Sequence, residues 1–270
     1  MWVALILSGT VCVRCEAATP PIRPGKVEAF QVPSRHEGRQ RRVWVYTPPG
    51  DISIGTDLGL VLAFDGEEYL TRIALPHILD SLLADGSTPP QLALLVDDST
   101  STARLNDLAN RAWFVDFVGN ELVPWVRQHW KVTRDPARTI ITGSSAGGLA
   151  AAYIALRRPD LFGNVLSQSA ALWRGSEASN GPPYEWLTAR AARWPRRRVR
   201  FWLEVGSTET RGALNGRAPS ILAANRAFRD TLRAKGYDVT YIEVANGVHG
   251  VETWGPRLPA GIAGLAPAHK

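Results

Sequence analysis

The chain has 270 residues, 45% of them apolar and 21% charged, and its 31 Lys and Arg against 25 Asp and Glu give a net charge of +6. This length suits one α/β domain, the apolar content excludes general disorder, and the lack of a run of about 18 apolar residues argues against a polytopic membrane protein. The basic excess is mostly scattered arginine without zinc spacing, zipper heptads or an RNA-binding motif, so we expect no nucleic-acid partner.

The N-terminus has the pattern of a signal peptide. An apolar stretch over 2–13 is followed by the small residues Ala17 and Ala18 and then by a proline-rich segment. We therefore predict a signal peptide over 1–18, one domain over 19–270, and a periplasmic or secreted protein without membrane contact after signal removal. A buried N-terminal strand is the alternative. Both cysteines lie in the first 18 residues, so the mature chain would hold no disulfide and no cysteine nucleophile.

Strands and helices are predicted to alternate along the rest of the chain. Strands are expected over 27–32, 41–46, 58–64, 91–96, 139–142, 163–167, 199–205 and 239–244. Helices are expected over 72–83 with a break at Pro76, over 113–130 with Pro124 as an interior flaw, and over 146–157, 184–193 and 219–235. This alternation predicts an α/β fold with one doubly wound, mostly parallel sheet covered by helices on both faces.

The densest charge, Arg196 to Arg198, immediately precedes the strand expected from Val199. In open α/β sheets, ligands bind beyond the carboxyl ends of the strands. The arginine cluster lies at the amino end of its strand, so we interpret it as a solvated loop.

One segment has the pattern of a nucleophile. Residues 139–148 read as an apolar strand, then Gly143-Ser144-Ser145-Ala146-Gly147, then an alanine-rich helix. This is a Gly-x-Ser-x-Gly elbow, in which the central serine occupies a strained strand-to-helix turn and flanking side chains would clash with the neighbouring strand and helix. The pattern predicts Ser145 as the nucleophile.

A serine nucleophile needs a base and an acid, which follow it in hydrolases of this kind in the order Ser, Asp or Glu, His. His249 lies in a glycine-rich loop after the last strand and is the predicted base; His269 is in the polar tail, and His77 is expected to be structural. For the acid we prefer Glu209, in the loop after the strand over 199–205. Glu204 inside that strand remains open, and Glu252 is a third choice.

The oxyanion hole should combine two backbone N–H groups. We expect them to come from Ala146, at the start of the helix, and from Glu67, because Gly66 lets the preceding loop turn inward. No metal cluster, phosphate loop or dinucleotide fingerprint is found, so no metal site and no cofactor are predicted.

These residues resemble the enterochelin esterase group of α/β-hydrolases. The likeness rests on Phe64 to Glu67, on Arg104-x-x-Asp107-Leu108 with Asn110 and Phe114, on 143–148 continuing through 162–169, and on Asn225 to Ala227 with His249 and Trp254. The resemblance implies an α/β-hydrolase fold and ester hydrolysis, with catecholate siderophore trilactones as a candidate substrate class. It also places Arg104 near the site, where it would bind an anionic group; an ion pair with Asp107 is the alternative. The chain departs from the group at Val248 and Gly250, usually glycine and aspartate.

Together these features predict a serine esterase with a Ser-His-Glu triad, an acyl-enzyme intermediate, and a small-molecule ester substrate such as a ferric siderophore. An acyltransferase of the same fold and a catalytically silent binding protein are the alternatives.

Overall fold

The computed structural model describes residues 23–36, 38–50, 58–97, 101–175 and 182–266, with only the backbone given for 101–103. The predicted signal peptide, its alternative as a buried strand, and His269 lie outside these ranges. Within them, no helix is long and apolar enough to cross a membrane.

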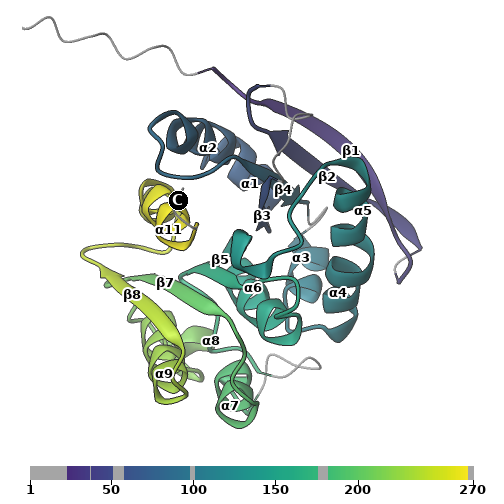
Figure 1. The fold of residues 1–270 in the computed structure, drawn as a ribbon. Helices are drawn as coiled ribbons and strands as arrows, with labels where there is room; N and C mark the ends of the chain where they lie inside the picture. Colours follow the sequence, from purple (N-terminus) through teal and green to yellow (C-terminus); the bar gives the residue numbers. More distant parts are fainter. Residues whose placement is uncertain (1–22, 37, 51–57, 98–100, 176–181, 267–270) are drawn as a thin grey trace, which may run out of the picture.

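The described strands form one sheet, in the order β1-β2-β4-β3-β5-β6-β7-β8 (Figure 1). The first two strands form an antiparallel hairpin, β2 pairs antiparallel with β4, and all other pairs are parallel. The strands are β1 (Lys26–Ser34), β2 (Arg39–Thr47), β3 (Gly59–Ala63), β4 (Gln91–Val96), β5 (Thr139–Ser144), β6 (Asn164–Gln168), β7 (Arg200–Gly206) and β8 (Asp238–Val244).

Helices cover both faces of this sheet, as predicted. The central strand β3 shows why: Leu60 and Leu62 belong to one apolar core, and Val61 and Ala63 to a second core on the opposite face. One face is covered by α1 (Gly66–Thr71), α2 (Leu75–Ala84) and α11 (Leu258–Leu265). The other is covered by α4 (Ala112–Asp116), η1 (Phe117–Leu122), α5 (Val123–His129), α6 (Ala146–Arg157), α7 (Trp186–Arg193) and α9 (Ile221–Ala234).

The remaining short segments lie in the connections. They are α3 (Ser101–Asp107), η2 (Pro136–Arg138), α8 (Ala213–Gly216), α10 (Val251–Trp254) and η3 (Gly255–Arg257). The sequence pattern had not predicted α1, α3, α10 or α11, because each is too short or too uniformly apolar to show helical periodicity.

The two helices expected to contain an internal proline have different outcomes. Pro76 does not break a helix that starts at residue 72; it lies in the first turn of α2, which begins at Leu75. A proline is tolerated there because the N–H it lacks has no intrahelical acceptor. The helix predicted over 113–130 is one helical run through α4, η1 and α5, since Asp116 and Leu122 at the two junctions have right-handed helical angles. Pro124 is an interior residue of this run, as predicted, and lies just after the π-helical turn η1.

The arginine cluster lies where the sequence placed it. Arg196, Arg197 and Arg198 are exposed in the loop before β7, and Arg196 Nε donates to the carbonyl of Gly236, 2.8 Å away. Because β5 to β8 run parallel, their carboxyl ends meet at the opposite edge of the sheet, where Ser144 is in register with Gln168 and Gln168 with Glu204. The loops after β5, β7 and β8 therefore share one edge.

Candidate active site

Ser145 forms the sharp turn between β5 and α6. Its φ of 54° and ψ of −117° lie outside the regions that L-residues normally occupy, a conformation that costs about 1–3 kcal/mol. Two hydrogen bonds hold the turn: the Ser145 N–H donates to the Gln168 carbonyl, and the Ala171 N–H donates to the Ser145 carbonyl, both at 2.9 Å. The turn is thus fastened to the end of β6, and the side chain of Ser145 remains partly exposed.

The two glycines of the motif are required by close packing. A Cβ atom on Gly143 would lie 2.4 Å from the carbonyl carbon of Gly147, so any side chain there would collide with the start of α6. A Cβ atom on Gly147 would lie 3.1 Å from Asp65 Oδ2. The motif therefore sets the strand against the helix, and brings the loop after β3 against the first turn of α6.

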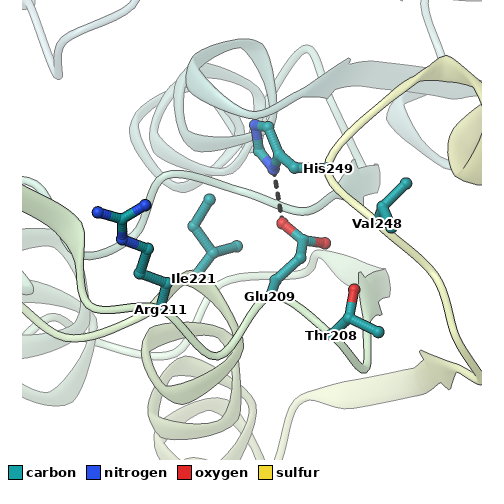
Figure 2. A pocket seen from close by; sticks show the side chains of 6 residues that line it. All are labelled: Thr208, Glu209, Arg211, Ile221, Val248 and His249. Carbon is teal, nitrogen blue, oxygen red and sulfur yellow. Dashed lines mark hydrogen bonds and ion pairs between the residues drawn. The ribbon is translucent and has the colours of Figure 1, made fainter.

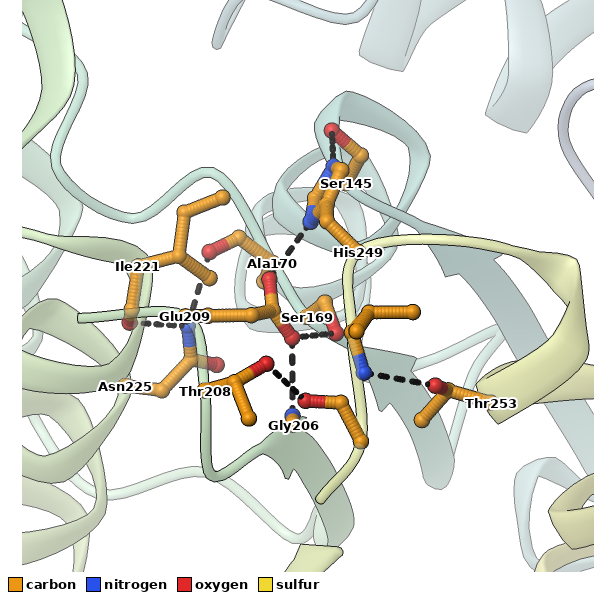
Figure 3. A network of polar contacts seen from close by, with 12 residues as sticks. Ser145, Ser169, Ala170, Gly206, Thr208, Glu209, Ile221, Asn225, His249 and Thr253 are labelled. Atoms are coloured by element: carbon orange, nitrogen blue, oxygen red, sulfur yellow. Dashed lines mark hydrogen bonds and ion pairs between the residues drawn. The ribbon is translucent and has the colours of Figure 1, made fainter. Parts of the chain in front are cut away.

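His249 lies in the loop after β8, and its ring bridges two side chains (Figure 3). Its Nε2 is 3.0 Å from Ser145 Oγ, and its Nδ1 is 2.5 Å from Glu209 Oε2. These three residues lie 104 and 40 positions apart in the chain, and the carboxyl edge of the sheet brings them together. His249 faces solvent, because its side chain is 36% exposed, whereas the Glu209 side chain is buried and only 4% exposed.

Glu209 is held by both oxygens. While Oε2 faces His249, Oε1 accepts hydrogen bonds from Ser169 Oγ at 2.6 Å and from the Gly206 N–H at 2.7 Å. The second acid considered from the sequence, Glu204, is buried in β7 and contacts Gln168 and Trp202 instead, at 2.9 and 2.8 Å. As expected for a carboxylate inside a strand, Glu204 has its own partners.

Two residues that the sequence had not assigned complete this network. The Trp254 indole N–H donates to Ser169 Oγ at 2.9 Å, and its ring packs edge-to-face against His249 with 5.1 Å between centroids. Ser169 and Trp254 thus connect the acid and the imidazole. Figure 3 shows the contact between Ser169 and Glu209. Ser169 and Trp254 both belong to the segments that carry the family resemblance, and this was the sequence signal that could have identified them. Glu252, the third choice for the acid, lies in α10 between His249 and Trp254.

The two expected oxyanion donors begin neighbouring helices. Ala146 is the first residue of α6 and Glu67 lies in the first turn of α1, so neither backbone N–H has an intrahelical acceptor. Gly66 lets this loop approach β4, since a Cβ atom there would lie 2.8 Å from the carbonyl carbon of Leu95. The positive ends of both helix dipoles favour negative charge at this point.

Arg104 binds Asp65, the residue that precedes this loop. Its guanidinium contacts both carboxylate oxygens, with Nη2 2.8 Å from Oδ2 and Nε bonded to Oδ1. The sequence left open an ion pair with Asp107, but Asp107 is paired with Arg41 at 2.6 Å, where both side chains are 1% exposed. Because Asp65 lies against the first turn of α6, Arg104 neutralises a carboxylate beside the expected oxyanion site.

Further charges surround this ion pair. Burial, followed by the Asp65 carboxylate, raises the pKa of Glu68 above its usual value. Burial, followed by the positive charges of Arg104 and Arg111, lowers the pKa of Arg174, which is 6% exposed. In the described ranges no group of three or more His, Cys, Asp or Glu side chains is arranged to hold a metal ion.

Comparison with known proteins identifies relatives of this chain. A family model described as "Putative esterase" matches residues 34–265. The iron(III) enterobactin esterase of Escherichia coli K12 is 30% identical over 262 residues, which is 93% of this chain and 62% of that protein. The crystal structure of the enterobactin esterase from Shigella flexneri in the presence of enterobactin has a TM-score of 0.76 and 28% identity, covering 92% of this chain and 60% of that one.

A more distant structure shares the fold. The ferulic acid esterase of Anaeromyces mucronatus is 16% identical with a TM-score of 0.70, and the match covers 96% of this chain and 97% of that one. The α/β-hydrolase fold predicted from the sequence is therefore confirmed. The chain spans 62% of the length of the Escherichia coli enterobactin esterase and 60% of the length of the Shigella flexneri one.

Proposed function

Because this chain belongs to the putative esterase family, we propose that it is a serine carboxylic-ester hydrolase with Ser145 as nucleophile, His249 as base and Glu209 as acid. The observation that carries the proposal is the unbroken series of contacts from Ser145 Oγ through His249 to Glu209, at 3.0 and 2.5 Å. A strained serine at a helix N-terminus, in contact with an imidazole that a carboxylate orients, is the arrangement that acyl transfer requires.

In the first half-reaction Ser145 Oγ attacks the ester carbonyl carbon while His249 Nε2 takes its proton. The carbonyl oxygen becomes negatively charged, and the N–H groups of Ala146 and Glu67 stabilise it. When the tetrahedral adduct collapses, the bond to the alkoxy oxygen breaks and His249 gives its proton to that oxygen. The alcohol leaves, and the acyl group stays on Ser145.

In the second half-reaction water attacks the acyl carbon and loses a proton to His249. Collapse of the new adduct breaks the bond to Ser145 Oγ, which recovers the proton from His249, and the carboxylic acid leaves. Glu209 keeps Nδ1 of the ring protonated and stabilises the imidazolium that forms in each half-reaction. Its own orientation depends on Ser169 and Gly206, which occupy its second oxygen.

For the substrate we propose an ester of the siderophore trilactone type or a related acyl ester. The support is the identity to enzymes named for iron(III) enterobactin. We further propose that the protein acts in the periplasm or is secreted, on the strength of the signal-peptide pattern over 1–18. Recovery of an exported form that begins at Thr19 would test the location.

The test of the nucleophile is a matched pair of serine variants. We expect Ser145→Ala to lower kcat on p-nitrophenyl butyrate by about 10³-fold or more and to abolish labelling by a fluorophosphonate probe. Ser144→Ala is the control: its hydroxyl is buried next to Ser145 in the chain and has no hydrogen-bond partner among the described residues. Full activity of Ser145→Ala would refute the proposal. A second experiment, mass spectrometry of the products formed with an added alcohol acceptor, would distinguish hydrolysis from acyl transfer.

A further inference from the structure

Positive side chains gather at the edge of the sheet that lies opposite the proposed active site. Because β5 to β8 run parallel, the connections that precede these strands meet at their amino ends. We call this region the basic edge. It consists of the last turns of α5, α6, α7 and α9 together with the connection that follows each helix, over 126–138, 154–163, 190–199 and 231–237.

The basic edge carries more positive charge than the whole chain. Its four segments contain thirteen Arg and Lys side chains against two acids, Asp135 and Asp160. Since the whole chain has a net charge of only +6, the remaining residues taken together are net negative. The protein therefore has its positive charge concentrated at one edge of the sheet.

Local contacts account for only part of this charge. The helix dipole favours the arginines in the last turns of the helices, and Arg158 is paired with Asp160 at 2.8 Å. The connections differ, because Arg134, Arg197 and Arg198 are exposed and their side chains make no hydrogen bond or ion pair within the part of the chain that the structure describes. Like charges on one surface repel each other, so a partner of opposite charge would stabilise them.

The basic edge is level as well as broad. The first residues of β6, β7 and β8 are paired in register, and β5 begins one residue earlier. The connections also contact each other, since the Gly163 N–H donates to the Pro136 carbonyl at 2.9 Å and Arg196 Nε donates to the Gly236 carbonyl at 2.8 Å. Four neighbouring strands span roughly 14 Å. A level array of positive charge over this width suits a planar, negatively charged partner.

The basic edge is remote from the proposed active site. Figure 2 shows a pocket beside Glu209 and His249, formed by loops that follow β7 and β8. Because β7 has seven residues, the two edges of the sheet lie about 20 Å apart, at roughly 3.3 Å per residue. A small substrate at Ser145 therefore cannot reach the basic edge, and a partner bound to the basic edge leaves Ser145 accessible.

The residue types on the basic edge favour a lipid surface. Among the described residues, no exposed large apolar side chain lies on it, so the contact is made by charge and not by insertion. Trp194, which is partly exposed between Arg193 and Arg196, is of a type enriched at membrane–water interfaces. Double-stranded DNA is read by a helix or strand that enters a groove, whereas helices end at this edge and connections face outward.

We propose that the basic edge docks the protein onto a bilayer that contains anionic lipids, with the active site turned away from the bilayer. This docking is independent of the proposed ester hydrolysis. No membrane contact was expected from the sequence, but a peripheral contact through charged side chains needs no apolar segment and leaves no mark on hydropathy.

Sedimentation with vesicles tests the docking. We expect the full chain to bind vesicles of phosphatidylcholine with about 30% phosphatidylglycerol at least about tenfold more tightly than vesicles of phosphatidylcholine alone, and to lose this preference in about 0.5 M NaCl. The comparison of two lipids separates charge from any contact of the apolar stretch over 2–13, which does not depend on lipid charge. Equal binding to the two kinds of vesicle would overturn the proposal.

Two double variants locate the contact. Replacing Arg197 and Arg198 by Gln should weaken binding to the anionic vesicles by about tenfold or more, because each basic side chain near the surface contributes about fivefold to the affinity. The control replaces Arg35 and Arg217 by Gln. These two arginines are also exposed but lie outside the basic edge, so the same loss of charge should change binding by less than about twofold. Equal losses would mean that the net charge of the molecule determines binding, and the proposed surface would be wrong.

The orientation and the kind of partner are tested without any measurement of hydrolysis. On binding to anionic vesicles, hydrogen exchange should slow in the connections over 130–138 and 194–199 and stay unchanged in the loops that follow β5, β7 and β8. The reverse pattern would show that the active site faces the bilayer. If the Arg197 and Arg198 double variant keeps its binding to vesicles but loses binding to duplex DNA or to polygalacturonate, the basic edge serves another polyanion and a bilayer is the wrong partner.

Discussion

Glu209 presents one carboxylate oxygen to His249 because the other is occupied. Ser169 Oγ and the Gly206 N–H both donate to Oε1, and Trp254 donates to Ser169, so the orientation of the imidazole depends on residues that touch no substrate. We regard Ser169 and Trp254 as positioning residues. Such a buried network has a single well-defined geometry when every member has its partner.

Loss of the Ser169 hydroxyl should therefore slow the chemical step. We expect Ser169→Ala to lower kcat by about 10- to 100-fold with little change in KM, since a hydrogen bond to a charged group contributes about 1.5–3 kcal/mol. The control is Ser167→Ala, two residues earlier in the chain. It removes a buried hydroxyl that donates to the Gly148 carbonyl. Equal losses in the Ser167 and Ser169 variants would assign Ser169 a structural role only.

At this scale the sequence favoured Glu209 over Glu204, because a carboxylate in the loop beyond the strand can reach the imidazole, whereas one inside the strand needs its own partner. The two residues are five positions apart, with Glu204 inside β7 and Glu209 after its end. In the structure Glu209 faces His249, while Glu204 contacts Trp202 and Gln168. Arg104 is a different case: its partner Asp65 lies 39 residues away, on another loop.

At the scale of elements, helix ends determine the layout around the site. The C-terminal end of α6 is held by Arg158, whose guanidinium binds Asp160 at 2.8 Å and Asn120 of η1 at 2.9 Å. This joins α6, the helix that follows Ser145, to the π-helical turn on the same face of the sheet. Of the two prolines that looked like helix breakers, Pro76 occupies a first turn, where the lack of an N–H costs little. Pro124 lies inside a continuous helical run, just after the π-helical turn η1.

The contact at the end of α6 gives a pH-dependent stability. The hydrogen bonds from Arg158 lower the pKa of Asp160, so this carboxylate stabilises the fold above its unfolded pKa, and the stabilisation is lost as the pH falls through the lowered folded pKa. Because Asp160 is 59% exposed, we expect Asp160→Asn to cost less than about 1 kcal/mol at pH 7 and nothing once the acid is protonated in both states. Urea unfolding at several pH values measures the difference. An equal loss of unfolding free energy at every pH would contradict this account. The control is Asp238→Asn, which changes a carboxylate that has no ion pair in the described ranges.

For the whole molecule, the least expected contact is the buried pair between Arg41 and Asp107. It joins the N-terminal hairpin to α3, which carries Arg104, and the Arg41 guanidinium also lies over the rings of Phe114 and Phe117, 5.3 and 5.1 Å from their centroids. The hairpin is thereby coupled to the loop beside the nucleophile. A buried charge without its partner destabilises a fold strongly.

We therefore expect Asp107→Asn to lower the free energy of unfolding by about 3–5 kcal/mol. Asp97→Asn, which breaks the pair with Arg42, a side chain that is 46% exposed, should cost less than about 1 kcal/mol. Thermal and urea unfolding of both variants measure the contrast. Similar stabilities for the two variants would mean that the buried pair adds nothing to the fold.

The sequence by itself determined the alternating strands and helices, the two-faced burial and the elbow at Ser145, because these depend on the period of apolar residues and on glycines within a few positions of one another. The sequence also predicted the position of the densest charge cluster, which lies in an exposed loop at the amino end of β7. Only the tertiary structure decided which carboxylate Arg104 binds, and that Ser169 and Trp254 support Glu209 and His249. Those contacts join loops that are distant in the chain, and their geometry is set by how the parallel strands align, which no local pattern encodes.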